Sequence, residues 1–285
     1  MGSNIRGGIG ADANLSYDYG MKKVYIFDVD GVLNGLNAYE PDGRVLEQVG
    51  KLLEAGSTIA FNTGRGYEWV EQTIISGIRE HLSSSEKLDR LFVAAEMGGV
   101  TVEFKNGVEQ RNPSVFSLRQ DQIQRAKELF DEYVKDGSVM HWDAEKVSMA
   151  TAALNDGADI EVFATESAPF AARMRDEFAG QHVRVHHNPV AVDVMRPEAG
   201  KWAGAQLIYE WLQRTPDADA TDFVCFGDSP LDYEMARFFS AQGHGIEFVF
   251  TGKSLGETEH DPKVVFTKTN SLYSEGTFEY LKQAN

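Results

Sequence analysis

Two carboxylates follow the first apolar run of the sequence. Residues 25–33 read YIFDVDGVL, so Asp28 and Asp30 come directly after the run 23–27, which has the length and composition of a buried strand. Asp-Gly between apolar residues is a strong signal for a β-hairpin. Alternatively, a strand that ends in two acids can supply a nucleophile and a proton donor. Residues 31–43 show no evident partner strand, and a helical pattern follows them, which favours the chemical interpretation.

Polar residues also follow two further apolar runs, at 57–62 and 222–226. The first leads into NTGR and the second into GDSPLD, and Lys201 lies in the first turn of the helix expected before the second run. Each feature alone has an ordinary interpretation: a turn, a surface lysine, or a helix cap made by Asp228 or Ser229. In a doubly wound sheet, however, ligands bind beyond the carboxyl ends of the strands, so these residues should converge on one edge.

The elements that position these residues alternate between strand and helix. Apolar runs predict strands over 23–27, 57–62 and 91–95, and helical spacing predicts helices over 44–55 and 67–82. The same rhythm returns after Lys201, with helices expected at 200–213, 230–239 and 277–283 and strands at 222–226, 246–250 and 263–266. This alternation is typical of parallel βαβ units.

The middle of the chain has a different pattern. Asn106-Gly107 predicts a hairpin within 100–109, and Ser117 with Gln120 predicts a capping box for a helix ending near residue 135. Strands are expected at 147–153, 159–164, 182–187 and 190–195, with a helix at 168–179. The predicted fold class is therefore α/β, a Rossmann-like doubly wound parallel-sheet core with an inserted α+β cap domain. The expected divisions are a disordered extension or expression remnant at 1–20, core at 21–111, cap at 112–196, and core at 197–285.

Composition limits the classes of partner. The chain of 285 residues has 44 acidic and 27 basic residues and a formal charge of −17, which disfavours nucleic acid and anionic membranes. No apolar run is long enough to span a bilayer, and residues 1–20 lack the apolar core of a signal peptide. Cys225 is the single cysteine, expected in the core, and suits a cytoplasmic protein. The chain alone does not indicate an oligomeric state.

Four carboxylates at one edge would need a cation. Crowding of Asp28, Asp30, Asp228 and Asp232 raises the free energy of their ionised forms unless a cation shares the site. Ligands that are all carboxylate oxygens, without histidine or cysteine, are typical of Mg²⁺. Since Mg²⁺ commonly binds a substrate phosphate as well, the sequence predicts a phosphate site beside the metal. Its predicted ligands are Asp28, Thr63, Gly64 through its backbone, and Lys201.

Together these motifs resemble the haloacid dehalogenase-like superfamily of phosphohydrolases. The resemblance rests on DVDGVL from Asp28, TGR from Thr63, Lys201, and GDSPLD containing Asp228 and Asp232, in the family's order. The long insert before Lys201, preceded by Glu96-Met-Gly-Gly-Val, resembles the branch with an α/β cap, which includes Cof-type, sucrose-phosphate and mannosyl-phosphoglycerate phosphatases. The chain departs from that branch at Leu231 and Met97, where asparagine is frequent.

The resemblance implies a role for each matched residue. Asp28 would be the nucleophile that forms an aspartyl-phosphate, and Asp30 would protonate the leaving oxygen and then activate water. Asp28, the backbone carbonyl of Asp30 and Asp228 would ligate Mg²⁺, with Asp232 orienting the site or adding a ligand. Thr63 and Lys201 would bind the transferring phosphoryl group.

The function implied is that of a Mg²⁺-dependent phosphatase for a small phosphorylated metabolite, with a phosphosugar favoured. Two alternatives remain: a phosphosugar mutase of the same branch, resembling phosphomannomutase, or a non-catalytic ligand-binding protein on the same fold.

Several further residues are candidates for substrate contact. Strand alternation places His182, Arg184 and His186 on one face of a predicted strand and His187 on the other. A polar exposed face explains these residues equally well as a binding surface in the cap. The predicted substrate contacts are Arg65, Glu96, His186, His187, Asn188 and Asp193.

Overall fold

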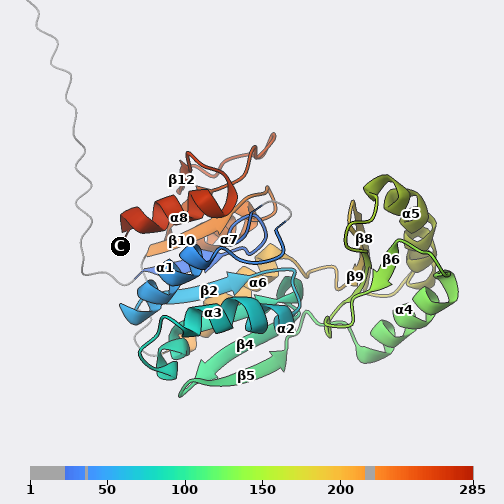
Figure 1. Ribbon diagram of the computed structural model, residues 1–285, viewed down its shortest axis with the longest axis horizontal. Helices are drawn as coiled ribbons and strands as arrows, with labels where there is room; N and C mark the ends of the chain where they lie inside the picture. The colour runs from blue at the N-terminus through green and yellow to red at the C-terminus, as the bar shows by residue number, and fades with distance from the viewer. Residues whose placement is uncertain (1–22, 36–37, 216–221, 285) are drawn as a thin grey trace, which may run out of the picture.

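The computed structural model describes residues 23–35, 38–215 and 222–284; the extension predicted at 1–20 lies outside them. In these residues, eight strands form one sheet in the order β12-β11-β10-β1-β2-β3-β4-β5 (Figure 1). The strands are β1 (Val24–Phe27), β2 (Thr58–Asn62), β3 (Leu91–Ala95), β4 (Val100–Lys105), β5 (Val108–Pro113), β10 (Asp222–Gly227), β11 (Gly245–Phe250) and β12 (Val264–Lys268).

Strand β1 lies in the middle of this sheet, parallel to β2 on one side and to β10 on the other. The hairpin interpretation of Asp30-Gly31 is therefore wrong, because both neighbours of β1 come from distant parts of the chain. The hairpin predicted at Asn106-Gly107 is present and joins β4 to β5, which extend the sheet in antiparallel fashion. The carboxyl ends of β1, β2 and β10 meet at one edge, as the doubly wound fold requires.

Helices cover both faces of the core sheet. Tyr25 and Phe27 of β1 pack with α1 (Gly43–Glu54) and α8 (Tyr273–Ala284) on one face. Val24 and Ile26 pack with α6 (Lys201–Arg214) and α7 (Tyr233–Ala241) on the other. Because both faces are buried, β1 and β10 are apolar without alternation, which is the pattern of a central parallel strand.

The predicted helix over 67–82 is a broken helical segment. It consists of α2 (Tyr67–Val70), a π-helical turn (Glu71–Ile75) and α3 (Ser76–Arg79). Short 3₁₀ segments, Ser85–Arg90 and Glu96–Gly98, flank β3. A π-turn inserts one extra residue into the helical repeat, so apolar spacing alone does not reveal it.

The inserted cap is a four-stranded antiparallel sheet with two helices on one face (Figure 1). Its strands lie in the order β6-β7-β9-β8, with bounds Met140–Trp142, Ala150–Leu154, Ala191–Met195 and Arg184–Asn188. Helices α4 (Gln120–Tyr133) and α5 (Ile160–Glu177) pack on Ala150, Ala152, Val192 and Val194. Strands β8 and β9 lie nearer the core in the view than α5 does, so the face without helices is turned toward the core.

Two local predictions in the cap are wrong. Residues 159–164, predicted as a strand, begin α5, because Asp159 caps that helix by accepting hydrogen bonds from the N–H groups of Glu161 and Val162. The capping box at Ser117 is also absent: the Ser117 hydroxyl donates to the carbonyl of Gly99, and α4 begins three residues later.

Cys225 is fully buried within β10, as predicted. Among the described residues, no helix is both long and apolar enough to cross a membrane.

Candidate active site

A buried lysine lies between two aspartates at the carboxyl edge of the sheet. Lys201 begins α6, and its ammonium group donates a hydrogen bond to Asp28 Oδ1, immediately after β1. The same Nζ lies 2.9 Å from Asp232 Oδ1 and donates to the carbonyl of Asn62, at the end of β2, over 2.7 Å. Asp28, Asp232 and Lys201 are each less than 10% exposed. The edge predicted from separate motifs is therefore one contiguous cluster.

Asp228 completes the acidic side of this cluster. The loop after β10 is folded by Asp232, whose Oδ2 accepts hydrogen bonds from the N–H groups of Asp228 and Ser229 and from the Ser229 hydroxyl. Gly31, with a φ of +73°, lies against the Asp228 carboxylate, and an added Cβ would collide with that carboxylate. The glycine thus lets the two loops approach closely enough for carboxylates from both to meet.

The charges of this cluster do not balance. One oxygen from each of Asp28, Asp228 and Asp232 lies within 4.8 Å of the others, and Lys201 supplies a single positive charge. Burial, reinforced by the charge of Asp232, raises the pKa of Asp28 well above its usual range despite Lys201. The same two causes raise the pKa of Asp228 to about 6. Two uncompensated carboxylates with oxygen ligands at this spacing fit a hard divalent cation.

Asp30 lies apart from the three clustered carboxylates and is held by Arg65. The guanidinium donates to both oxygens of Asp30, through Nη2 at 2.7 Å and Nε at 3.0 Å, while Asn34 Nδ2 donates at 3.2 Å. Burial raises the pKa of Asp30, but the hydrogen bonds and charge of Arg65 outweigh it and hold the pKa below its usual value. Arg65 also stacks on the ring of Trp69, 4.6 Å from its centroid.

Thr63 and Gly64 form a tight turn after β2. Thr63 is fully buried; its N–H donates to Ala94, and its Oγ1 accepts from the N–H of Arg65 at 3.1 Å. An added Cβ at Gly64 would meet the methyl group of Met97 at 2.9 Å. The turn therefore brings backbone close to the Asp28 cluster while Arg65 reaches across to Asp30.

Glu96 lies at the junction between core and cap. Glu96 and Met97 both have positive φ, 53° and 58°, which is uncommon for residues other than glycine. Glu96 Oε2 accepts hydrogen bonds from the N–H groups of Val147 and Ser148 and from the Ser148 hydroxyl, at 2.7–2.9 Å. Burial raises the pKa of this carboxyl despite those hydrogen bonds. Through these contacts Glu96 fixes the cap loop at Val147 and Ser148 to the core. A role of Glu96 in substrate binding remains a prediction.

Solved structures share this architecture. The C-terminal domain of trehalose-6-phosphate phosphatase from Candida albicans aligns with a TM-score of 0.64 at 13% identity, over 92% of this chain and 91% of that one. A haloacid dehalogenase-like hydrolase from Bacteroides thetaiotaomicron aligns with a TM-score of 0.62 at 14% identity, over 93% and 100%. Sucrose-phosphatase from Synechocystis, solved with sucrose and phosphate, aligns with a TM-score of 0.52 at 14% identity, over 92% and 98%.

This chain has the fold of the haloacid dehalogenase-like hydrolases. No model of a known protein family matches the sequence, and no curated protein matches it either. The fold implied by the resemblance of four short motifs is thus confirmed, at sequence identities of 13–14%. The α/β class with a doubly wound core and an inserted cap is confirmed as well.

The haloacid dehalogenase-like fold places the predicted cap residues on two different faces. Asp193 is buried, pairs in register with His186 and Thr151, and lies 3.5 Å from Asn188 Nδ2 through its Oδ2. His187 lies on the opposite face, where its Nε2 is 2.8 Å from the Ser167 hydroxyl of α5. Burial lowers the pKa of His187. Because His187 packs against the outer helix, we leave it out of the proposed site.

Sequence reasoning missed two residues that support the catalytic edge. Asn62 Nδ2 donates to the carbonyl of Lys201 at 2.8 Å, and so fixes the start of α6. Asn34 Oδ1 accepts from the N–H of Gly31 at 2.8 Å, while its amide reaches Asp30. Both lie next to motif residues, but their partners depend on how distant segments meet, which spacing does not reveal.

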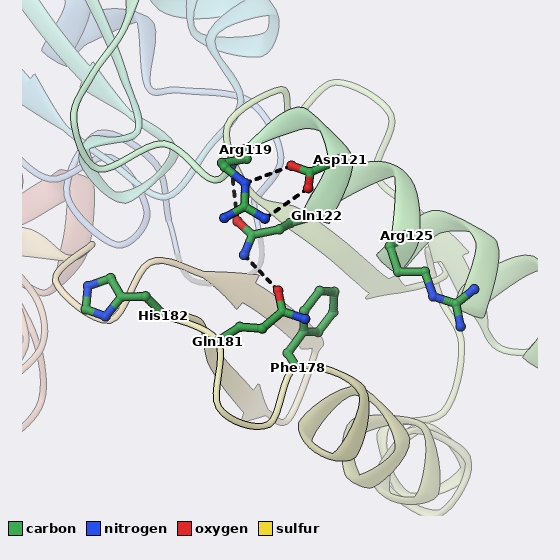
Figure 2. A pocket seen from close by; sticks show the side chains of 7 residues that line it. All are labelled: Arg119, Asp121, Gln122, Arg125, Phe178, Gln181 and His182. Atoms are coloured by element: carbon green, nitrogen blue, oxygen red, sulfur yellow. Dashed lines mark hydrogen bonds and ion pairs between the residues drawn. The ribbon is translucent and has the colours of Figure 1, made fainter.

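A hollow on the cap lies away from the sheet edge (Figure 2). It measures about 400 Å³ and is lined by residues of α4 and of the loop after α5: Arg119, Asp121, Gln122, Arg125, Phe178, Gln181 and His182. Its charged groups are already paired: Arg119 with Asp121 and Arg125 with Glu177. Because its arginines are already paired with carboxylates, this hollow is a less suitable phosphate-binding site than the sheet edge.

Proposed function

We propose that this protein is a phosphatase that hydrolyses a phosphomonoester of a small metabolite, with a phosphosugar as the favoured substrate. The observation that carries the proposal is the cluster of Asp28, Lys201, Asp228 and Asp232 at the carboxyl edge of the sheet. The named activities of trehalose-6-phosphate phosphatase and sucrose-phosphatase, which share the fold, support the choice of a phosphosugar.

Asp28 is the proposed nucleophile. Lys201 holds Oδ1 of this carboxylate, which leaves Oδ2 to attack phosphorus and form an aspartyl-phosphate as the bond to the leaving oxygen breaks. Lys201, the Thr63 hydroxyl and the backbone of Gly64 would bind the transferring phosphoryl oxygens. In the second step a water molecule attacks the phosphoryl group and releases inorganic phosphate, which regenerates Asp28.

Asp30 is the proposed general acid and base. It would give a proton to the leaving oxygen in the first step and take one from the attacking water in the second. Arg65 donates to both oxygens of this carboxylate, so it fixes the orientation of Asp30, and the substrate would have to compete with Arg65 for these oxygens.

Mg²⁺ is the proposed cofactor, held by Asp28 and Asp228, with the backbone carbonyl of Asp30 as a predicted ligand and Asp232 as a supporting group. When bound, it would neutralise the excess charge of the carboxylates and that of the phosphoryl oxygens. Without a cation, burial and the charge of Asp232 raise the pKa of Asp28, which disfavours the ionised form that attacks phosphorus.

The test is release of inorganic phosphate from a panel of phosphorylated metabolites, with Mg²⁺ and with a chelator. We expect Mg²⁺-dependent release, and we expect Asp28→Asn to abolish it while the variant stays folded by circular dichroism. Asp131→Asn is the matched control, since Asp131 is exposed on α4 of the cap. Undiminished turnover by Asp28→Asn would end the nucleophile assignment. Transfer of phosphate between sugars without release would indicate a mutase, and binding without any product a ligand-binding protein.

A further inference from the structure

The face of the cap sheet that carries no helices is continuous with the catalytic edge. Met149 and Met195 lie on this face and pack with Met97 of the core. The N–H of Met97 in turn donates to the carbonyl of Thr63 at 2.9 Å. Because side chains on one face of a strand recur every second residue, Thr151 and Asp193 lie one step farther along, about 7 Å from the methionines. This row of the cap sheet therefore lies over the phosphate-binding turn.

Four polar residues gather at this place, and we call them the cap cluster: Asp143, Lys146, Thr151 and Asp193. Thr151 donates to Asp193 Oδ1 at 2.7 Å, and Lys146 Nζ lies 3.2 Å from Thr151 Oγ1. The ammonium is farther from the two carboxylates, 3.7 Å from Asp143 and 3.8 Å from Asp193.

The loop that carries Lys146 touches the core at the catalytic edge. A Cβ added at Gly66 would lie 3.4 Å from Glu145, so the loop rests directly on the residue after Arg65. Burial lowers the pKa of Arg65, but Asp30 raises it above its usual value, with smaller contributions from the charges of Tyr39 and then Asp143. The loop that carries Lys146 thus contacts the core next to Arg65, the residue that holds the proposed general acid Asp30.

The hydrogen-bonding capacity of the cap cluster is largely unused. The side chain of Lys146 is 13% exposed. Within the described chain its ammonium group has one hydrogen-bond partner, Thr151. An ammonium has three donors, so two remain. Among the residues that the structure describes, the hydrogen bond to Asp193 Oδ2 is a long one, from Asn188 Nδ2 at 3.5 Å. Buried polar groups without full hydrogen bonding are costly, and a ligand that supplies the missing partners is favoured.

We propose that the cap cluster binds the leaving group of the substrate, and that this leaving group is uncharged and carries neighbouring hydroxyl groups. A hydroxyl can accept from Lys146 and donate to Asp193 or Asp143 at once, whereas a carboxylate or second phosphate can only accept. Two carboxylates beside one ammonium also give the cluster a net negative charge, which repels a second anionic group. Lys146 is the specificity-determining residue, and the inference rests on the proposed phosphatase activity.

A matched pair of substrates tests the chemical class. Glycerol 3-phosphate and 3-phosphoglycerate differ only in whether the far end is a hydroxymethyl or a carboxylate group. With Mg²⁺ present, we expect the wild-type protein to have the higher kcat/KM for glycerol 3-phosphate, and a preference for 3-phosphoglycerate overturns the inference. Release of phosphate from neither of these compounds, nor from glucose 6-phosphate or p-nitrophenyl phosphate, would instead overturn the proposed function itself.

The second arm tests the residue. Lys146→Met removes the ammonium but keeps the length of the side chain, and the readout is the ratio of kcat/KM for glucose 6-phosphate to that for p-nitrophenyl phosphate. We expect this ratio to fall about 10- to 100-fold, the effect of losing a hydrogen bond from a charged group. The control Lys127→Met removes an exposed lysine that pairs with Asp131 on the outer helix α4, and should leave the ratio unchanged.

Thr151→Val keeps the test decisive if Lys146→Met does not fold. Valine preserves the volume at this position but removes the hydroxyl that links Lys146 to Asp193, and the ratio should fall in the same direction. An unchanged ratio in a folded Lys146→Met or Thr151→Val variant shows that the cap cluster only fastens the loop, and overturns the inference.

Discussion

Replacement of Lys201 by methionine should strongly destabilise the metal-free protein. Lys201 Nζ contacts the carboxylates of Asp28 and Asp232, whose side chains are 10% and 1% exposed, so methionine would leave both buried without a cation. Breaking a buried ion pair from one side costs roughly 3–5 kcal/mol. For a domain of this size each kcal/mol lowers the melting temperature by about 2–4 °C, so in chelator we expect a decrease of about 6–20 °C.

Differential scanning calorimetry of the Lys201→Met variant in chelator, and again with Mg²⁺, measures this effect. Mg²⁺ should recover part of the loss, because a cation bound by Asp28 and Asp228 restores positive charge to the cluster. The control is Lys51→Met, since Lys51 pairs with Glu47 on an exposed helical face and such pairs contribute about 0–1 kcal/mol. If Lys201→Met and Lys51→Met melt at the same temperature in chelator, the account of a charge-unbalanced buried cluster is refuted.

Two further predictions concern the metal site. In the metal-free protein Asp228 has a pKa of about 6, raised by burial and by Asp232, so below that pH the folded state holds a proton that Mg²⁺ must displace. The rise in melting temperature caused by Mg²⁺ should therefore be larger near pH 7.5 than near pH 5; an equal rise would contradict it. Gly31→Ala should abolish this rise, because its Cβ would displace the Asp228 carboxylate, whereas Gly43→Ala, with open space around it, should keep it.

The sequence predicts the proposed catalytic edge because its residues belong to strand ends. Parallel strands end at one edge whatever their order, so Asp28, Thr63 and Asp228 could be placed together without knowledge of the packing. The prediction of a strand at 159–164 was wrong. Its β-branched residues are typical of a strand, but Asp159 caps the start of a helix there. Local propensity is outweighed there by hydrogen bonds at the helix start.

The cap cluster could not have been predicted in the same way. Lys146 stands in a loop, and its meeting with Asp193 depends on the pairing of β7 with β9 rather than on any local pattern. The hydrogen bonds from Arg65 to Asp30 likewise join residues that are 35 positions apart and belong to different βα units. Such contacts depend on how side chains from different elements point toward one another in the folded protein. The spacing of residues along the chain does not predict this.

The central position of β1 has a consequence for how the protein acquires its activity. Its neighbour β10 lies on the far side of the inserted cap, and Lys201 is 173 residues from Asp28. Contacts of such long sequence separation form slowly because a large loop must close first. During synthesis the whole cap is available to fold before β10 emerges. Asp28, the proposed nucleophile, therefore lacks its contact with Lys201 until late in synthesis, and the proposed active site is complete only when most of the chain has been made.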